Sequence, residues 1–559
     1  MSQKSTNSER KCRLLWNNSF KYRQNVIQLK WPETVISLAK PLFWGVLMYY
    51  SEDKDQVVLA EFLMPFAGKL DPQNRWVRLS SIMPWDKIEE IYLRTMSTET
   101  GRKAISARIA FGAIYIKESE NLTDEGCVTA IRENPYMQYF LGLHEFQQEP
   151  LFDASMMVHF RKRFPVEDVA KINEYVCTGK WPEANRSVDR NAEKATDQEE
   201  EKDDNHDDQN GQPPKGPGSG KSVRGKVNPN TSKKKRARKK NRGKLIMDAT
   251  VAPSDIKYPT DIDLLNQCRE HLETAIDMMW AAVPHKGHKL PYSAKKARKV
   301  YLNISKSKRW TAKKLRKGIV EQLRFIEQAQ KRFSQLMSLV PDVKFPRYLQ
   351  DRLQVIPIVY AQQKEMYENH THICKDRIVS LEQPFVRPIN RGKRPNPTEF
   401  GQKLHLSVVE GYTYLEQTSW SNFNEGCDLQ AVAEEYFRKF GCYPEAILAD
   451  KIYQNRENRR YCAEHDIRLT GPALGRPKKG DTGAKEARQI YKDACARNAV
   501  EGRNGNLKRR YGLDLIMSKL DETAKTEAAR NILAMNVAHR LHRWLLRFFA
   551  FRRFALVFQ

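Results

Sequence analysis

Two single carboxylates stand in apolar stretches of this sequence. Asp248 lies inside the run 245–251 and Asp450 follows the run 446–449, and both runs have the length and composition of buried strands. A carboxylate in such surroundings is unfavourable unless a metal ion, a cation or hydrogen bonds compensate its charge. If the two strands are neighbours in one sheet, the carboxylates meet at one edge, where a divalent cation would relieve their repulsion. The alternative is that each aspartate caps the loop or helix that follows it.

A third carboxylate, Glu501, lies in a helical stretch with the spacing R-x3-E-x6-K. Arg497 precedes Glu501 by one helical turn, and Lys508 follows it by two turns, so all three side chains share one helix face. A carboxylate flanked by cations in this way can hold a metal ion while the cations bind phosphates. An exposed stripe of ion pairs would show the same spacing, so the helix by itself leaves both interpretations open.

The surrounding pattern predicts the elements that position these acids. Alternation of apolar and polar residues over 399–408 predicts a half-buried strand, and Gly411 predicts a hairpin to the strand 412–417. Residues 429–440 keep helical spacing and end at Gly441, 467–469 suit a short strand, and a helix over 485–509 carries Glu501. Residues 261–375 are rich in helix formers, most clearly over 311–339, and we interpret this block as a helical insertion.

A charged linker divides the chain. Residues 183–243 contain an acidic stretch, a Pro/Gly-rich stretch and the basic run 233–240, with little apolar surface, so we expect disorder there. The basic run either contacts phosphates or is a solvated tether. Residues 84–182 predict a mainly helical domain that binds nucleic acid or serves as an interaction module, and residues 1–83 show no clear periodicity. The α/β domain then spans 244–545, and 546–559 form a C-terminal tail.

Composition narrows the class of partner. The chain of 559 residues has a formal net charge of +28, which favours a polyanionic partner such as nucleic acid. A membrane is a poorer fit, because the polar start lacks a signal peptide and the apolar stretch 544–558 is interrupted by three arginines. The nine cysteines contain no C-x-x-C pair, which argues against a disulfide framework and a structural zinc site and favours a reducing cytoplasm.

Several stretches, together with the order Asp248, Asp450 and Glu501, resemble the DDE transposases of bacterial insertion sequences, in particular the insertion-sequence-five-like group. The resemblance runs from about residue 84 to about residue 545, excluding the linker, and rests on the order of its motifs rather than on any one of them. The motifs are Phe140-Leu141-Gly142-Leu143, Phe152-Asp153, Met247-Asp248-Ala249-Thr250, Arg391-Gly392-Lys393, Glu399-Phe400-Gly401-Gln402-Lys403, Ala449-Asp450-Lys451-Ile452-Tyr453, Asn498-Ala499-Val500-Glu501-Gly502, Leu507-Lys508 and Tyr511-Gly512-Leu513.

The sequence departs from the group at one position. The related signature is Y-x2-R-x3-E-x6-K, and its tyrosine position holds Ala494, with Tyr491 one turn earlier. The resemblance implies an α/β fold with an RNase H-like mixed-sheet catalytic domain that carries the helical insertion and follows a mainly helical N-terminal domain. It further implies that Asp248, Asp450 and Glu501 hold two Mg²⁺ (or Mn²⁺) ions, and that Arg497 and Lys508 position the DNA backbone near the cut.

The resemblance also implies a reaction and its partners. The protein would bind double-stranded element ends, cleave a phosphodiester with water and transfer the freed 3′-OH into target DNA, without a covalent protein intermediate. Synapsis of two ends would need a homodimer or a larger assembly, associated with the prokaryotic nucleoid in the cytoplasm. Two alternatives stay open: an RNase H-like nuclease that does not join strands, and a transposase-derived DNA-binding protein without catalysis.

Overall fold

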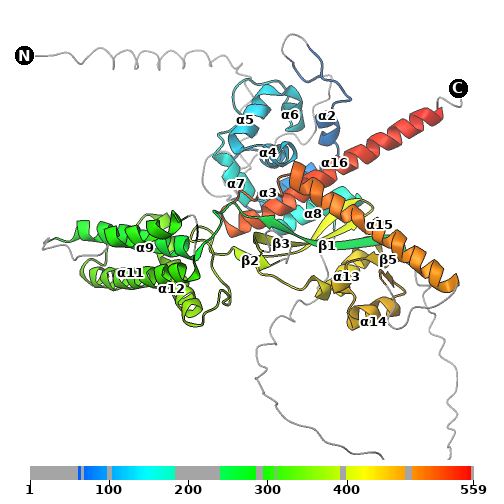
Figure 1. Ribbon diagram of the computed structural model, residues 1–559. Coiled ribbons are helices and arrows are strands. Elements are labelled where there is room, and N and C mark those ends of the chain that lie inside the picture. Colours follow the sequence, from blue (N-terminus) through cyan, green and yellow to red (C-terminus); the bar gives the residue numbers. More distant parts are fainter. Residues whose placement is uncertain are drawn as a thin grey trace, which may run out of the picture. The chain divides into compact units, whose positions relative to one another are not determined.

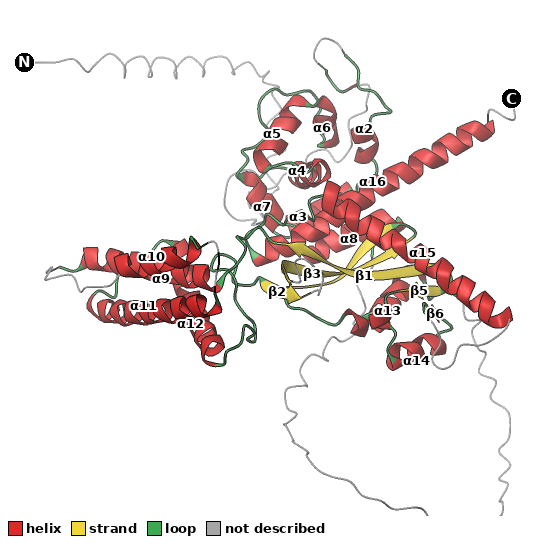
Figure 2. Cartoon of the chain, in the orientation of Figure 1, coloured by secondary structure: helices red, strands yellow, loops and turns green. Residues whose placement is uncertain are grey.

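The computed structural model describes residues 61–64, 68–96, 104–182, 240–284, 294–307, 309, 311–390, 398–471 and 481–555. Figure 1 follows the chain in sequence colours, and Figure 2 separates helices from strands. Predictions for residues 1–60, for 183–239 of the linker and for the motif 391–393 fall outside this part of the chain. The described residues combine a mixed sheet with many helices, as the predicted α/β class requires.

The described residues before the linker are mainly helical. Their central helix, α4, is buried on almost every side and is capped by Ser106, whose hydroxyl accepts a hydrogen bond from the Ile109 amide. Helix α5 is capped by Thr123, and the first described helix already starts at residue 75, within the unassigned segment. The helices of this part are α2 (Arg75–Ser80), α3 (Trp85–Leu93), α4 (Ala107–Glu120), α5 (Asp124–Glu133), α6 (Pro135–Phe140), α7 (Met156–Lys162) and α8 (Val166–Thr178).

The last residues of the predicted linker differ from the expectation. The Asn241 amide donates to the backbone carbonyls of His465 and Asp466, and the Arg242 carbonyl accepts from the Tyr436 hydroxyl at 2.7 Å. Gly243 has a φ of +84°, and a side chain there would collide with that tyrosine oxygen. The packed part of the chain therefore begins before residue 244, because these polar residues find partners that hydropathy alone does not reveal.

One mixed sheet lies at the centre of the fold. Within the described residues it has six strands in the order β2-β3-β1-β5-β6, and β4 pairs with β3. Strand β1 is antiparallel to β3 and parallel to β5, and the predicted hairpin joins β3 to β4 through Glu410 and Gly411, both with positive φ. The strands are β1 (Lys244–Pro253), β2 (Arg387–Asn390), β3 (Thr398–Val409), β4 (Tyr412–Ser419), β5 (Ala446–Leu448) and β6 (Arg468–Leu469).

Strand β3 corrects one prediction. Its polar alternation predicted a solvent-facing side, yet Lys403, His405 and Ser407 are all buried. The apolar residues of β3 occupy one face of the strand, and its polar residues meet other polar groups on the opposite, equally covered face. Alternation indicates the two faces of a strand, but it does not indicate whether the polar face meets water or a buried hydrogen-bond network.

Helices cover both faces of the sheet. On one face, α13 (Leu429–Phe440) and α14 (Arg456–Glu464) pack on alternate residues of β1 and β5, beginning with Leu245 and Ile447. On the other face, α15 (Asp481–Arg510) packs through Val500 on Ile246 and Leu448. Short 3-10 turns, η3 (Glu425–Cys427) and η4 (Lys451–Tyr453), precede the helices α13 and α14.

The helical insertion has a core of its own. Its helices are α9 (Asp261–Ala282), α10 (Ala294–Ser305), α11 (Ala312–Leu339) and α12 (Arg347–Glu368). Leu265, Leu323, Ile326 and Ile356 are among the buried residues that hold these helices together. The clearest predicted helix, 311–339, is α11, and its predicted first residue Thr311 is the cap, with its hydroxyl bonded to the Lys314 amide.

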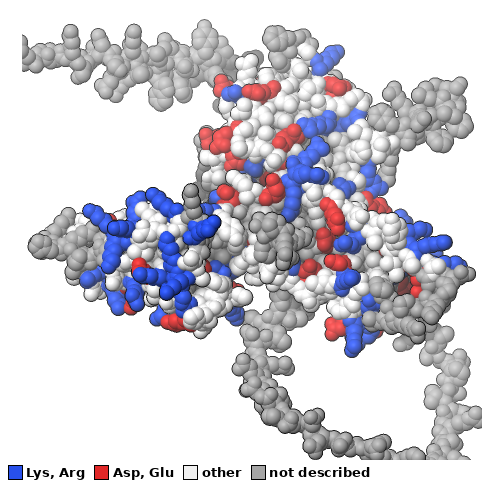
Figure 3. All heavy atoms as spheres, in the orientation of Figure 1, with Lys and Arg blue, Asp and Glu red and all other residues white. Residues whose placement is uncertain are grey.

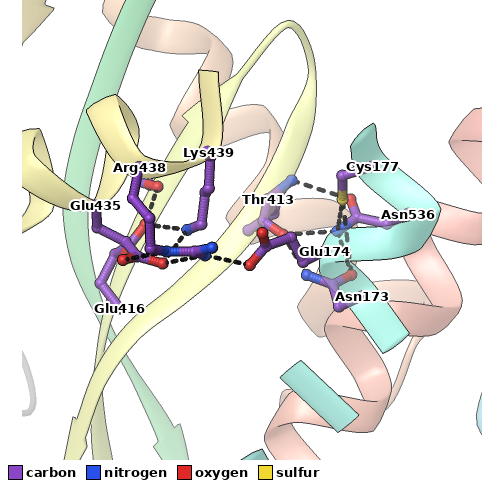
Figure 4. A network of polar contacts seen from close by, with 10 residues as sticks. Asn173, Glu174, Cys177, Thr413, Glu416, Glu435, Arg438, Lys439 and Asn536 are labelled. Atoms are coloured by element: carbon purple, nitrogen blue, oxygen red, sulfur yellow. Dashed lines mark hydrogen bonds and ion pairs between the residues drawn. The ribbon is translucent and has the colours of Figure 1, made fainter. Parts of the chain in front are cut away.

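The last helix, α16 (Asp521–Ala555), joins the N-terminal helices to the sheet and continues without a break through the predicted tail boundary at residue 546. Its buried Asn536 accepts from the Thr413 amide of β4 at 2.9 Å and donates to the Thr413 carbonyl and to Asn173 of α8 (Figure 4). Nearby, Arg438 of α13 binds Glu174 of α8. None of the described helices is both long enough and apolar enough to cross a bilayer.

Candidate active site

The register of two parallel strands brings Asp248 and Asp450 to neighbouring positions. Ile246 of β1 pairs with Leu448 of β5, and each aspartate stands two residues further along its chain. Because side chains alternate along extended backbone, each aspartate points to the same face as the apolar residue two positions before it. Ile246 and Leu448 pack against Val500 of α15, so both carboxylates lie on the side of the sheet that α15 covers.

Helix α15 supplies the third acid. Val500 is buried against the sheet, and the next residue, Glu501, has a side chain that is 60% exposed. Arg497, Glu501, Asn504 and Lys508 recur at intervals of three or four residues, which places them along one helix face. These four residues line the same cavity of about 870 Å³ as Asp248 and Asp450. The structure therefore brings together all five residues that the sequence singled out.

Each acid has a different local partner. Asp248 Oδ2 accepts a hydrogen bond from Asn504 Nδ2 at 3.2 Å, whereas Glu501 Oε1 lies 3.5 Å from Arg497 Nη2. Asp450 Oδ1 accepts from the Lys451 amide at 2.7 Å and caps η4. The capping role that the sequence left open is thus real for Asp450, and it fixes this side chain at the end of β5 while the residue still lines the cavity.

A buried lysine and a fourth carboxylate complete the cavity wall. Lys403 Nζ donates to Asn422 Oδ1 at 3.0 Å and to Glu425 Oε2 at 2.5 Å, and its side chain is only 11% exposed. All three residues line the same cavity as Asp248. The sequence alone does not predict a role at the site for these three residues or for Asn504. Asn504 could have been found from the helical spacing, because it continues the stripe of Arg497 and Glu501.

A buried hydrogen-bond chain holds the loop that carries Asp450. His405 of β3 is fully buried, with Nδ1 3.1 Å from Asp428 Oδ2 and Nε2 2.9 Å from the Tyr453 hydroxyl. The Asn458 amide binds the carbonyls of Tyr453 and Gly426, which ties η4 to η3. Burial first, and then the negative charges of neighbouring carboxylates, raise the pKa of the Tyr453 hydroxyl well above its ordinary value. Tyr453 therefore stays protonated and holds the turn that begins at Asp450.

The donor chemistry of the cavity suits a hard divalent cation. Asp248, Asp450 and Glu501 offer carboxylate oxygens, which Mg²⁺ prefers. Among the described residues, however, no three acidic, His or Cys side chains lie close enough together to hold one ion. Glu501 is exposed and faces Arg497, so ion binding would require its side chain to leave that cation and approach the aspartates.

Tyr491, the tyrosine one turn before the signature position, does not line this cavity. Its side chain is 71% exposed on α15. The signature position itself holds Ala494. The departure from the family pattern therefore leaves the carboxylate cavity without a tyrosine from this helix among the described lining residues.

Comparisons with known proteins find transposase features in two separate parts of the chain. Residues 447–538, which include Asp450 and Glu501, match the family model described as "Transposase DDE domain". Residues 65–163, among the N-terminal helices, match the model described as "Transposase domain (DUF772)". No solved structure gives a significant match.

One curated relative is 37% identical over 94 residues, the "Uncharacterized protein ORF8 in nfe locus" of Rhizobium meliloti. The match covers 17% of this chain and 45% of that protein, so the chain spans less than half of the relative's length. The relative's name states no activity. The two family models, found in the expected order along the chain, support the interpretation of this protein as an insertion-sequence DDE transposase.

Proposed function

We propose that this protein is a DNA transposase of the insertion-sequence-five-like group, which binds the ends of its element, cleaves phosphodiester bonds and transfers the 3′-OH ends into target DNA. The observation that carries the proposal is the meeting of Asp248, Asp450 and Glu501 in one cavity with Arg497 and Lys508. The strand order supports an RNase H-like catalytic domain, since the central strand β1 pairs antiparallel with a hairpin on one side and parallel with the short strand β5 on the other, and β6 follows β5.

The three carboxylates are the groups that would hold two Mg²⁺ or Mn²⁺ ions. When bound, such ions lower the pKa of an attacking water and stabilise the negative charge on a leaving 3′ oxygen. Asn504 orients Asp248 by donating a hydrogen bond to one of its carboxylate oxygens. The cap on Asp450 and the chain from Tyr453 through His405 keep the second acid in place.

Arg497 and Lys508 would neutralise backbone phosphates beside the acids, because both cations line the same cavity. In the first reaction, water displaces the 3′ oxygen of one nucleotide, and a 3′-OH and a 5′-phosphate result. In the second reaction that 3′-OH attacks a target phosphodiester, so one bond forms for each bond broken. Both reactions need the same carboxylates, and the protein forms no covalent bond with DNA.

The test separates catalysis from binding. Asp248→Asn is compared with wild type for duplex affinity, for Mg²⁺-dependent cutting of labelled element ends and for joining to a second duplex. We expect unchanged affinity and melting temperature with cutting and joining lost. Asp514→Asn, which changes an exposed carboxylate that does not line the cavity, should behave as wild type.

Three outcomes would replace the proposal. Cutting by the Asp248→Asn protein would show that this carboxylate is not catalytic, and loss of folding would show that its role is structural. Cutting by wild type without joining would identify a nuclease. Binding without metal-dependent cutting in any variant would identify a DNA-binding protein that does no chemistry.

A further inference from the structure

The helical insertion is strongly polarised in charge. Residues 294–320, which span α10 and the first third of α11, contain no acidic residue. Helix α9, in contrast, carries five acidic residues and a single arginine, Arg269. In Figure 3, Lys and Arg cover much of the visible surface over these helices, with few acidic atoms between them. The cations of the stretch 294–320 are Lys295, Lys296, Arg298, Lys299, Lys306, Lys308, Arg309, Lys313, Lys314, Arg316 and Lys317.

Helix α10 is fixed with its basic side outward. Ala297 and Ile304 are buried, and the Ala297 carbonyl accepts from Gln322 Nε2 of α11 at 2.9 Å. The Tyr301 hydroxyl donates to Asp263 Oδ1 of α9 at 2.6 Å. Gly318 lets the two helices approach closely, because a side chain there would overlap Ile304. These contacts hold the opposite side of α10 toward solvent as a rigid surface.

The outward side forms a continuous basic surface, which we call the α10 face and define by Lys295, Arg298, Lys299 and Lys306. These residues follow helical spacing, are all exposed, and line one hollow of about 510 Å³ together with Leu302, Asn303 and Ser307. Within the described residues none of the four forms an ion pair with a carboxylate. Four neighbouring cations without counter-charges repel one another, and a polyanion would relieve that repulsion.

From this arrangement we propose that the α10 face binds the phosphate backbone of duplex DNA without reading its sequence. The face presents flexible cations and two small polar side chains, which suit phosphate oxygens along a groove edge. No large apolar side chain is fully exposed between residues 294 and 320 in the described part, and Leu302, the apolar residue that lines the hollow, is half-buried. The face therefore lacks the exposed apolar groups with which membrane-surface helices insert. Duplex DNA is chosen as the polyanion because the proposed function makes it the substrate, and to that extent the inference rests on that function.

The test compares two variants, one that loses three positive charges from the α10 face and one that loses three from elsewhere in the insertion. The variant K295Q/R298Q/K299Q is compared with K344Q/R347Q/K364Q, whose exposed cations lie before and along α12 among acidic residues. Full-length proteins bind a labelled random-sequence duplex at several salt concentrations without divalent ions. We expect the face variant to bind about ten- to a hundredfold more weakly near 0.1 M salt, with the slope of log affinity against log salt reduced by roughly 2–3.

The control variant should keep the wild-type slope within about one unit, since both triple variants lose the same net charge. Equal affinities for the two variants, with both melting like wild type, would overturn the proposal. Tight binding of wild type to phosphatidylserine vesicles that the face variant loses, with duplex binding unaltered, would overturn it in favour of a lipid surface. If wild type shows no cutting but the face variant still weakens duplex binding, the proposed function fails and this inference stands.

Discussion

Asn504 Nδ2 of α15 lies 3.2 Å from Asp248 Oδ2 of β1, and this hydrogen bond links the helix of the third acid to the strand of the first. The bond crosses the same cavity that Asp450 and Glu501 line. The Asn504 amide is neutral, so it orients the Asp248 carboxylate without neutralising its charge. An arginine at the same position would neutralise that charge. The contact therefore couples the orientation of the Asp248 carboxylate to the position of α15 on the sheet.

The replacement Asn504→Ala tests this link. We expect the rate of DNA cutting to fall about tenfold or more, because a hydrogen bond to a charged group is worth roughly 1.5–3 kcal/mol. The measurement is the single-turnover rate at saturating Mg²⁺, with thermal melting as the check on folding. Asn506→Ala on the same helix, outside the cavity, should leave the rate unchanged. Equal rates for both variants would mean that the Asn504 bond does not orient Asp248.

The buried chain through His405 predicts a graded loss of stability. His405→Leu leaves both Asp428 and the Tyr453 hydroxyl without their buried partner, and should lower the free energy of unfolding by about 2–4 kcal/mol. Tyr453→Phe removes one hydroxyl and should lower it by about 1 kcal/mol. Urea unfolding measures both values. Tyr461→Phe is the matched control, because the Tyr461 hydroxyl donates to Glu434 in an exposed contact. A loss of unfolding free energy in this variant as large as that for Tyr453→Phe would contradict the prediction.

A buried ion pair joins the N-terminal helices to α16. Arg530 Nε lies 3.1 Å from Glu118 Oε1, and both side chains are almost completely buried. Removing one partner leaves the other charge buried without its counter-ion, so Glu118→Ala should reduce the free energy of unfolding by about 3–5 kcal/mol. Denaturant unfolding gives the value. Glu90→Ala, which breaks the exposed pair with Lys87, should change it by less than about 1 kcal/mol, and a comparable loss at both positions would refute this account.

Stability should also fall in mild acid because of His539 on α16. Its surroundings lower the pKa to about 4 from 6.5, mainly through desolvation and then through the positive charge of Arg503. Arg503 Nη2 lies 3.0 Å from Nδ1, and Arg543, His542 and the Glu410 backbone also act on the ring. Between pH 6.5 and 4 the unfolded chain binds more protons at this position than the folded chain does, so folding stability declines as the pH falls through that window.

The variant His539→Gln keeps an acceptor for Arg503 but does not titrate. We expect the difference in melting temperature between pH 7 and pH 4.5 to be smaller for this variant than for wild type. The His144→Gln protein, changed at a histidine of the N-terminal helical part, serves as the control and should follow the wild-type profile. If His539→Gln and wild type lose stability in parallel, His539 does not carry the effect.

The sequence predicted the two strands that carry Asp248 and Asp450 because their apolar runs are clear, and it predicted a helix over 485–509 that carries Glu501. The start of α11 at Thr311 and the end of α13 at the left-handed Gly441 were also predicted, since each has a local physical cause. The common cavity of Asp248, Asp450 and Glu501 depends on which strands become neighbours. That order is a long-range property, and the resemblance to a family, rather than periodicity, indicated it.

The parts that the sequence did not reveal are polar and buried. His405 and Lys403 alternate with apolar residues, as a solvent-facing side would, yet each finds its partners more than eighteen residues away in the chain. Asn536 of α16 bonds with the backbone of Thr413, which no spacing rule connects with it. Hydropathy patterns indicate whether a residue prefers water or an apolar core. The positions of these buried polar side chains depend instead on specific hydrogen-bond partners, which only the folded chain brings together.

The most direct test of the central claim uses Asp450→Asn and a labelled duplex from the ends of the protein's own element. Wild type and variant are incubated with the duplex and a target plasmid, with and without Mg²⁺, after melting curves have shown that both proteins are folded. The account predicts 3′-end cutting and strand joining by wild type only when Mg²⁺ is present, and neither reaction by Asp450→Asn despite equal duplex affinity. Cutting and joining by the folded Asp450→Asn protein at the wild-type rate would contradict it.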